Sequence, residues 1–186
     1  MSLVIETQRL QLRKYEDRDS ADILEYSSDT DFWLARNLDW AVSDEGVREY
    51  WEGQRDVAAT IDAKWLSLLV ELKSEEKVIG NVGFGVVKNG EHRQGSVGWL
   101  LGRQYQRQGL ATEAVRALVT YCFTQLGLHR ISARTGSENT RSWRLMERLG
   151  MRREAHLKES HTVNGEWCDE YIYAVLASEW TDHTKK

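Results

Sequence analysis

The first half of the chain combines runs in which apolar and polar residues alternate with runs in which apolar residues recur at helical spacing. Residues 9–15 alternate as a strand does, and residues 17–29 and 43–61 carry apolar residues at the spacing of a helix face. Three further strand-like runs follow at residues 64–72, 77–87 and 94–101. The last two are joined through Asn89-Gly90, a dipeptide typical of hairpin turns, so this part predicts an antiparallel meander.

The second half continues with two helices and three strands. Residues 110–127 place a wide apolar stripe along a helix that Gly127 is expected to cap. A strand at 129–135, a helix at 138–150 and a hairpin of strands at 153–163 and 166–176 follow. The predicted order is β-α-α-β-β-β-α-β-α-β-β, a mixed α/β (α+β) fold. We expect a single domain over residues 1–186, with flexible ends at 1–3 and 181–186.

Composition and charge narrow the class of function. The chain has 186 residues, of which 41% are hydrophobic and 29% charged, as in an ordinary globular domain. A net charge of −4 argues against a nucleic-acid partner. No apolar run approaches the roughly 20 residues of a membrane span, and the N-terminus lacks the features of a secretory signal, so we expect a cytoplasmic protein. Cys122 and Cys168 fit no metal-ligand spacing and are expected to be free, buried thiols, with no metal bound.

The segment between the last strand of the meander and the long helix is richer in special residues than a turn requires. The run VGWLL is followed at residues 105–114 by YQRQGLATEA, which enters the helix directly. A strand that feeds a helix through a glycine-containing loop presents unpaired N–H groups and the positive end of the helix dipole, and this geometry binds phosphate. Gly109 and Ala111 have small side chains or none, so a diphosphate can approach the backbone of the first helical turn. Further donors come from Gln106, Arg107 and Gln108.

Other phosphate-binding motifs do not fit this loop. A Walker loop needs a Gly-Lys-Ser/Thr ending, and a dinucleotide-binding fold needs Gly-x-Gly-x-x-Gly in a parallel sheet; the sequence has neither. The loop alone leaves open a plain strand-to-helix turn, and also a nucleotide-binding α/β domain unrelated to acyl transfer.

The loop belongs to a wider pattern that resembles the GNAT superfamily of acyl-coenzyme A N-acyltransferases. The family motif Gln/Arg-x-x-Gly-x-Gly/Ala is present as Gln106-x-x-Gly109-x-Ala111, and Thr112-Glu113-Ala114 follows as in the Rim-type branch of ribosomal-protein N-terminal acetyltransferases. Other marks of that branch are ETQRLQLR at 6–13, ENTRSWRLMERLGM at 138–151, with Met where Phe is usual, and NGEWCDEYIYAVLASEW at 164–180. The resemblance covers nearly the whole chain. It implies a mostly antiparallel sheet with a splayed central strand pair and flanking helices.

The resemblance also implies that acetyl-coenzyme A is the donor and coenzyme A the product. The backbone from Gln106 to Ala111, including Leu110, would wrap the pyrophosphate, with Thr112 next in the first helical turn. The pantetheine arm would pair with the strand at Trp99, Leu100 and Leu101 as a further strand does, because the preceding strand diverges from its parallel neighbour, often with a bulge. Asn139 matches a position that hydrogen-bonds this arm; a helix cap beside Glu138 is the alternative, and the two roles are compatible.

The implied chemistry is direct attack of an amine on the thioester, without an acyl-enzyme. A backbone N–H near Leu100 or Leu101 is the expected oxyanion donor. Ser142 corresponds to the hydroxyl proposed to protonate the departing thiolate, close to the cofactor; a helix-surface serine is the alternative. Because a thiol has an ordinary pKa of about 8.5, losing this acid should cost less than losing the cofactor site.

The need for a general base depends on the acceptor. An α-amine, with a pKa of about 7.7–8.0, is partly neutral at neutral pH, whereas a lysine amine, with a pKa of about 10.4, is almost entirely charged. Alignment on the Asn164-Gly165 turn puts His161 where Rim-type relatives have an acidic base, and histidine as a residue type suits proton transfer near neutral pH. A hairpin histidine without a catalytic role is the alternative. Asp169 and Glu113 are weaker candidates, the first as a strand-pairing acid and the second as a partner of the helix dipole.

The acceptor is expected between the first two helices and the final hairpin. Asp169 would lie at this substrate site, and a cation-receiving rim would come from Trp33, Trp40, Asp29, Asp31 and Asp39, unless these are packed Trp and solvated acids. The predicted function is an acetyl-coenzyme A-dependent N-acetyltransferase whose amine acceptor is a protein N-terminus, ribosomal or other. Alternatives are a small-molecule acceptor (polyamine, amino acid or antibiotic) and a non-catalytic acyl-coenzyme A-binding module. We expect no nucleic-acid or membrane partner, and a homodimer is left open.

Overall fold

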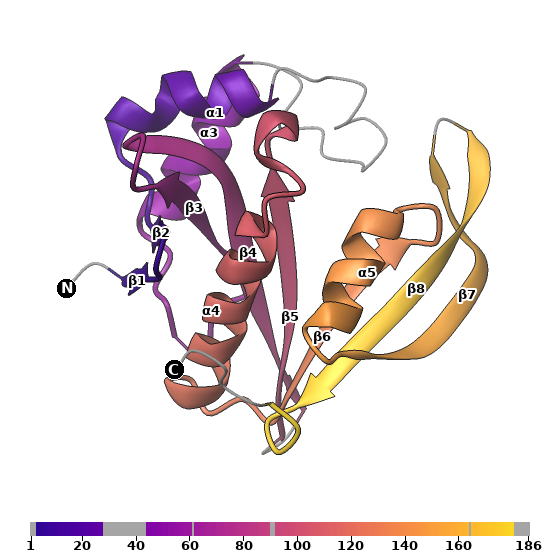
Figure 1. Ribbon diagram of the computed structural model, residues 1–186. Coiled ribbons are helices and arrows are strands. Elements are labelled where there is room, and N and C mark those ends of the chain that lie inside the picture. The colour runs from indigo at the N-terminus through magenta and orange to yellow at the C-terminus, as the bar shows by residue number, and fades with distance from the viewer. Residues whose placement is uncertain (1–2, 28–43, 61, 90–91, 164, 181–186) are drawn as a thin grey trace.

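The computed structural model describes residues 3–27, 44–60, 62–89, 92–163 and 165–180 (Figure 1). The strands are β1 (Val4–Glu6), β2 (Leu10–Arg13), β3 (Leu66–Leu72), β4 (Lys77–Asn89), β5 (His92–Leu101), β6 (Arg130–Gly136), β7 (Arg152–Val163) and β8 (Glu166–Leu176). The helices are α1 (Ser20–Ser27), α3 (Asp44–Arg55), α4 (Leu110–Thr124) and α5 (Thr140–Arg148), with single 3-10 turns η1 (Asp17–Asp19) and η3 (Arg103–Tyr105). Of the ends expected to be flexible, only Leu3 is described.

The strands form one mixed sheet, as predicted. Their order across the sheet is β1-β2-β3-β4-β5-β6-β8-β7. All neighbours are antiparallel except β5 and β6, which are parallel because α4 carries the chain back between them. The two hairpins bring Asn89 opposite His92 and Val163 opposite Glu166. Asn89 is therefore still a paired strand residue, whereas the Asn-Gly signal had placed it in the turn.

The central parallel pair is splayed. The strands β5 and β6 pair only from Gln94 with Arg130 to Ser96 with Ser132, and beyond that point they diverge (Figure 1). No register shift interrupts the β4–β5 pairing over the described residues, so the opening does not arise from a bulge there. One edge of Val97–Leu101 is consequently left without a partner strand.

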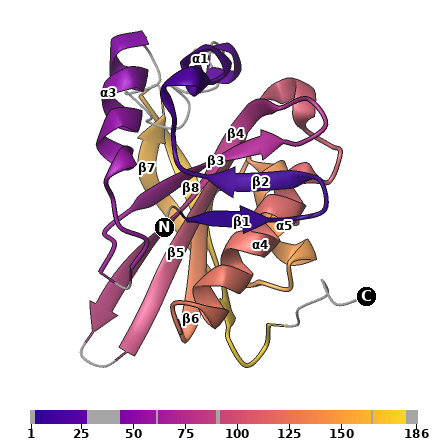
Figure 2. The same ribbon diagram turned by 90° about the vertical axis from the view of Figure 1, so that its left-hand side faces the viewer.

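Helices cover the sheet on both faces, and the strand residues alternate accordingly. Leu68 and Val70 pack with α4 in the larger core, whereas Leu69 packs with Ile23 and Trp51 of α1 and α3 in the smaller one. Figure 2 shows α3 on one side of the sheet and α4 with α5 on the other. Because both faces are buried there, strand β3 is almost continuously apolar.

Several boundaries differ from the sequence prediction, and the largest difference is the end of α3, at Arg55 and not near residue 61. The N-terminal strand is a hairpin, in which β1 precedes β2 and pairs with it antiparallel. Helix α4 ends at Thr124 with Gln125 as its C-cap, two residues before the predicted cap. Gly127 nevertheless adopts a left-handed φ of 63°, and the chain then turns so that the N–H of Leu128 donates to the carbonyl of Cys122.

Candidate functional site

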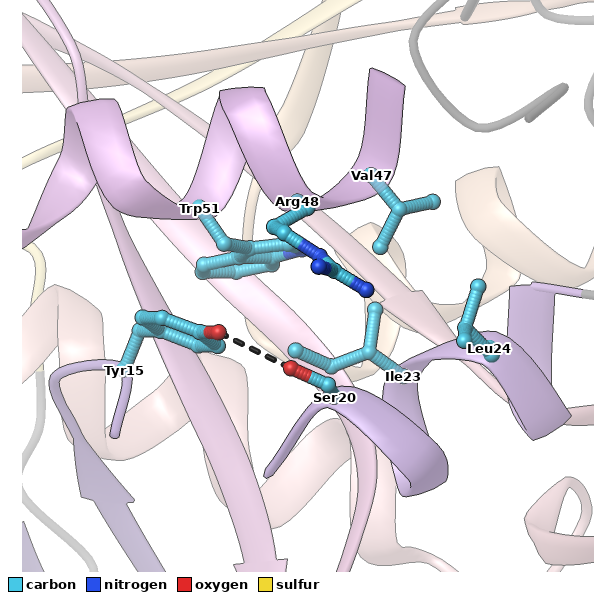
Figure 3. A pocket seen from close by; sticks show the side chains of 7 residues that line it. All are labelled: Tyr15, Ser20, Ile23, Leu24, Val47, Arg48 and Trp51. Atoms are coloured by element: carbon cyan, nitrogen blue, oxygen red, sulfur yellow. Dashed lines mark hydrogen bonds between the residues drawn. The ribbon is translucent and has the colours of Figure 1, made fainter. Parts of the chain in front are cut away.

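The hollow between α1 and α3 is too small for a ligand. Its volume is about 10 Å³, the space of a single water. Figure 3 shows the side chains around it, with the Tyr15 hydroxyl 2.9 Å from that of Ser20. They are Tyr15, Ser20, Ile23, Leu24, Val47, Arg48 and Trp51. Over the described residues, the first two helices therefore pack against each other and do not form an open pocket.

The splay between β5 and β6 opens into two adjoining cavities. The smaller cavity, of about 480 Å³, lies between the start of α4, strand β5 and the length of α5. The larger, of about 1240 Å³, extends to β6 and the β7–β8 hairpin. Residues that line both are Trp99, Gln106, Arg107, Asn139, Thr140, Arg141 and Ser142. The junction between the cavities therefore lies at the end of β5 and the first turn of α5.

Strand β5 turns alternate backbone groups toward this opening. The N–H of Gly102 donates to the carbonyl of Ile79 on β4, whereas the carbonyl of Gly95 accepts a bond from Ser132 on β6. Because backbone direction has a period of two, the N–H and C=O groups of Trp99 and Leu101 point into the opening and those of Leu100 point toward β4. Leu101 is thus the better placed of the two predicted oxyanion donors.

The loop before α4 has two residues in the left-handed conformation. Arg107 has a φ of 64°, and Gly109, the N-cap of α4, has a φ of 78°. The N–H groups of residues 107–112 donate to no described protein atom; the next, that of Glu113, donates to Gly109. These amides sit at the positive end of a helix of 15 residues beside the smaller cavity. They form the kind of concave donor surface that binds anions.

The β1–β2 hairpin fixes this loop through Glu113. The Glu113 carboxylate accepts from the Thr7 hydroxyl at 2.6 Å and from the backbone N–H and Nε of Arg9 at 2.8 and 2.7 Å. Arg9 also donates from Nη1 to the carbonyl of Gln108 at 3.0 Å. Burial alone would raise the pKa of Glu113, but the bonds from Thr7 and Arg9 leave that pKa below its ordinary value. Glu113 is therefore held as a structural carboxylate. We call Thr7, Arg9 and Glu113 the clasp.

Gln106 joins the two walls of the opening. Its Nε2 donates to the carbonyl of Leu101 at 2.9 Å, and its Oε1 accepts from Nη1 of Arg141 at 2.6 Å. The first residue of the family motif thus connects the end of β5 to the first turn of α5. It also places the Arg141 guanidinium at the junction of the two cavities.

The start of α5 brings Asn139 and Ser142 to that junction. Asn139 is the N-cap, and its side chain accepts from the N–H of Ser142 at 3.3 Å. The cap reading of Asn139 is therefore confirmed, while any contact to a ligand stays a prediction. The Ser142 side chain is half-buried and lines both cavities. Its hydroxyl donates to no described residue.

The β7–β8 hairpin contributes His161 to the larger cavity, opposite Cys168 in the strand register. Asp169 points to the other face of the hairpin and lines neither cavity. Its carboxylate accepts from Lys158 and His156, each at 2.7 Å, and from the N–H of Glu159 at 3.0 Å. Hydrogen bonds from Lys158, Glu159 and His156 hold the pKa of Asp169 far below its ordinary value. Asp169 thus makes contacts within the hairpin and lies away from both cavities.

Several other expected residues take different positions. Gln108 and Leu110 give no side chain to either cavity, so any part they have comes from their backbone N–H groups. Trp33, Trp40 and the acids Asp29, Asp31 and Asp39 lie outside the described residues. Both cysteines are free, but only Cys122 is buried, and burial raises the pKa of its thiol to about 12. Among the described residues no cluster of metal-binding side chains occurs.

Sequence reasoning missed the arginines of α5. Arg141, Arg144 and Arg148 all line the smaller cavity. They follow one another at intervals of three and four residues, which places them on one face of the helix. That spacing is legible in TRSWRLMER, but it points to a function only once α5 is known to face the loop before α4.

Comparison with known proteins agrees with this arrangement. Residues 9–152 match the model of the acetyltransferase (GNAT) domain. Over 176 residues the chain is 35% identical to an uncharacterized N-acetyltransferase, YnaD, of Bacillus subtilis, covering 95% of this chain and 98% of that protein. It is 26% identical to the [ribosomal protein uS5]-alanine N-acetyltransferase of Escherichia coli, covering 94% of this chain and 91% of the relative.

A solved structure shares the fold along nearly the whole chain. The structure of Mycobacterium smegmatis RimJ in complex with coenzyme A-disulfide superposes with a TM-score of 0.80 and 26% identity, covering 97% of this chain and 88% of that one. No helix in the described parts of the present chain is long and apolar enough to cross a membrane.

Proposed function

Because the chain belongs to the GNAT acetyltransferase family and is an N-acetyltransferase, we propose that it takes its acetyl group from acetyl-coenzyme A and transfers it directly to a primary amine. The observation that carries this proposal is the row of free amides at residues 107–112 beside the open edge of β5. A diphosphate matches the first feature and an extended amide-containing arm matches the second. A related protein of this fold was solved with coenzyme A-disulfide, which supports the same donor.

The residues present suit such a donor. The loop amides would hold the diphosphate, and the outward N–H and C=O groups of Trp99 would pair with amides of the arm. This placement brings the thioester to the junction near Ser142 and Arg141. The N–H of Leu101 would then donate to the carbonyl oxygen as negative charge develops on it.

The proposed reaction needs no covalent enzyme intermediate. The amine nitrogen forms a bond to the acetyl carbon, and the bond from that carbon to sulfur breaks. His161 would take a proton from the amine, and the Ser142 hydroxyl would give one to the departing thiolate. Both side chains line the larger cavity, whereas the buried thiol of Cys122 lines neither cavity and is held protonated by its raised pKa.

The acceptor we propose is a protein N-terminal α-amine. A relative that covers most of the chain acetylates the alanine of ribosomal protein uS5, according to its name. The charges of the larger cavity support this class over a polyamine. Its described lining contains Arg103, Arg107, Arg134 and Arg141 but only two acids, Glu138 and Glu170. A flexible polycation would be repelled there, whereas an N-terminus carries one amine of moderate pKa.

An acceptor panel tests this proposal. Purified protein would be given acetyl-coenzyme A with ribosomal N-terminal peptides, lysine, spermidine and an aminoglycoside, with free thiol and product mass followed together. We expect peptide-dependent thiol release and a mass gain of one acetyl group at the peptide α-amine. Tight binding of coenzyme A without thiol release for any amine would favour the non-catalytic binding module. Turnover restricted to spermidine would move the acceptor to the small-molecule class.

A further inference from the structure

One carboxylate in the larger cavity lacks the hydrogen bonds that a mostly buried charge normally has. Glu170 lies on β8 and lines this cavity, and its side chain is only 20% exposed. Among the described residues no donor forms a hydrogen bond with its carboxylate, and the ion pair it makes there is long, 3.5 Å to Nη1 of Arg134. A carboxylate can accept about four hydrogen bonds, and buried polar groups are normally satisfied. Glu170 therefore has unused capacity for a donor inside the cavity.

The neighbouring carboxylates do not share this property. Asp169, on the opposite face of the hairpin, is fully used by Lys158, His156 and the N–H of Glu159. The other acid of the larger cavity, Glu138, is exposed and accepts from the Ser137 hydroxyl at 3.1 Å. Among the described acids of the cavity, Glu170 is thus the one that is both shielded from solvent and without a hydrogen-bond donor.

The space beside Glu170 is open. In the strand register its neighbours are Gly136 on β6 and Leu157 on β7. Neither residue has a side chain that can donate a hydrogen bond. An added Cβ at Gly136 would have one described atom within 4 Å, the carbonyl oxygen of Asp169 at 4.0 Å, and Gly136 also lines the larger cavity. A small cation can therefore approach the carboxylate from the side of β6.

Glu170 also lies near the proposed base. His161 lines the same cavity and pairs with Cys168, which precedes Glu170 by two positions on the same face of β8. Diagonal neighbours across an antiparallel pair are about 7–8 Å apart, within reach of long side chains. A nitrogen atom between them can thus contact the Glu170 carboxylate and the His161 imidazole in turn.

The surrounding charge limits what this carboxylate can receive. The larger cavity is also lined by Arg103, Arg107, Arg134 and Arg141. A shielded carboxylate among arginines accepts one positive charge and disfavours a second one nearby. An N-terminal α-amine matches this pattern, because with a pKa of about 7.7–8.0 it carries a single charge at neutral pH.

We propose that Glu170 binds the ammonium group of the acceptor and holds it beside His161 until the proton is removed. This inference rests on the proposed acetyl transfer. A hydrogen bond from N⁺–H to a carboxylate is about 2.7–2.9 Å long, so it is shorter and stronger than the 3.5 Å contact to Arg134. Glu170 is thus an acceptor-binding residue that selects a charged primary amine over an uncharged chain end.

Steady-state kinetics of Glu170→Gln test this role. Loss of the charge-assisted bond should raise KM for a ribosomal N-terminal peptide by about tenfold or more, with kcat little changed because the ammonium is bound before the reaction. Glu170→Asp keeps the charge and should recover part of the lost affinity. Glu166→Gln is the matched control, since Glu166 lies on the same face of β8 but is exposed and lines neither cavity.

A binding measurement tests the same role without turnover. Protein loaded with coenzyme A is titrated with the peptide and with its des-amino form, in which hydrogen replaces the amino group. We expect the wild type to bind the free amine about tenfold more tightly or better, because only that form carries the positive charge. Glu170→Gln should bind both forms about as weakly as the wild type binds the des-amino form.

Several results would overturn the role of Glu170. The wild type could bind the two forms with equal affinity, or bind neither. Glu170→Gln could lose kcat at constant KM, or Glu166→Gln could raise KM by the same factor. Failure of the proposed function gives a different result: no amine would release thiol, while the wild type would still prefer the free amine in the titration.

Discussion

The two ends of the opening between β5 and β6 are built differently. At the loop end the interacting groups are backbone amides, and the Glu113 carboxylate holds their loop through hydrogen bonds from two residues of the β1–β2 hairpin. At the hairpin end the interacting groups are side chains on strands, and Nδ1 of His161 makes only a long contact among the described residues, 3.4 Å to the Ser160 hydroxyl. One end is fixed before any ligand arrives, and the other depends on individual side chains.

This difference indicates which part of the reaction each end governs. A carrier shared by many transferases needs a binding site of constant geometry. Main-chain donors held by a hairpin that is far away in sequence provide such a site at low reorganisation cost. An acceptor that varies between relatives needs a site that changes by single substitutions. His161, where the resemblance to Rim-type proteins implies an acidic residue, lies at that second end. Substitutions should therefore affect carrier binding at the loop and amine preference at the hairpin.

The sharpest test of the loop end is Gly109→Glu. The substitution forces a side chain into a φ of 78° and sets a carboxylate beside the expected diphosphate, so coenzyme A binding should fall below detection by titration. Gly150→Glu is the control, because Gly150 has a φ of 80° and no atom within 4 Å of an added Cβ. Unchanged affinity in Gly109→Glu would contradict the placement of the diphosphate.

The corresponding test of the hairpin end is His161→Ala. Without a base, turnover of a lysine-type amine should drop by about 100-fold, the lower end of what acid–base catalysis usually contributes. Turnover of an N-terminal peptide should fall by less than about tenfold, since an α-amine is partly neutral already. Steady-state rates for both amines measure the contrast, with His156→Ala on the opposite face as control. An equal loss for both amines would remove His161 from the role of base.

The clasp predicts a smaller effect at the loop end. Arg9→Ala removes two bonds to Glu113 and one to Gln108, so the loop should sample other conformations. We expect about tenfold weaker binding of coenzyme A, equivalent to about 1.4 kcal/mol, with kcat little changed. Arg18→Ala, which removes an exposed pair with Glu16 and a longer one with Glu71, both away from the loop, is the control. A fall in kcat at constant affinity would show that the clasp acts elsewhere.

Ser142→Ala should lower turnover only a few-fold. The leaving thiol has an ordinary pKa of about 8.5, so a thiolate departs near neutral pH without strong acid assistance. The loss should shrink as pH rises above the thiol pKa, because the departing sulfur is then stable as a thiolate and needs no proton. Free-thiol release measures it, with the exposed Ser178→Ala as control. A hundredfold loss at pH 8 would assign Ser142 a larger part.

The smallest effect concerns stability in acid. The folded-state pKa of Glu113 is lowered, so its carboxylate contributes stability that is complete above the ordinary value of 4.5 and is lost as pH falls through the folded value. Glu113→Gln should therefore lower Tm by a few degrees at pH 7, for a loss of about 1 kcal/mol. The difference from wild type should shrink below pH 4.5. A difference that is constant with pH would mean that the charge of Glu113 is unimportant.

Most of the fold is predictable from pattern because both periodicities are strong here. The apolar stripes of the helices and the alternation of the strands identify every described strand and α-helix from β2 onward, but not the 3-10 turns η1 and η3. The short β1 is missed, since three residues carry too little alternation to register as a strand. The cap of α4 is displaced by two residues, because a left-handed glycine can follow the true cap.

The site is predictable where the local backbone conformation requires a particular residue. It is less predictable where the position of a side chain depends on contacts between segments far apart in sequence. Gly109 is required by a left-handed N-cap, and the sequence identifies it. The orientation of Asp169 depends on a shift in the strand register between Leu157 and His161, which no pattern reveals. The clasp joins residues more than 100 positions apart in sequence. The arginines of α5 can be recognised as part of the site only once α5 is known to face the loop before α4.

The early divergence of β5 from β6 has a consequence for the solubility of the protein. An unpaired strand edge can pair with any extended polypeptide, and proteins normally cover such edges or make them unsuitable for pairing. Here the edge is retained in the middle of the sheet and recessed beside the arginine-bearing helix α5. A single extended molecule can reach this edge, whereas a second sheet would be too broad. The unpaired edge is therefore retained without promoting aggregation.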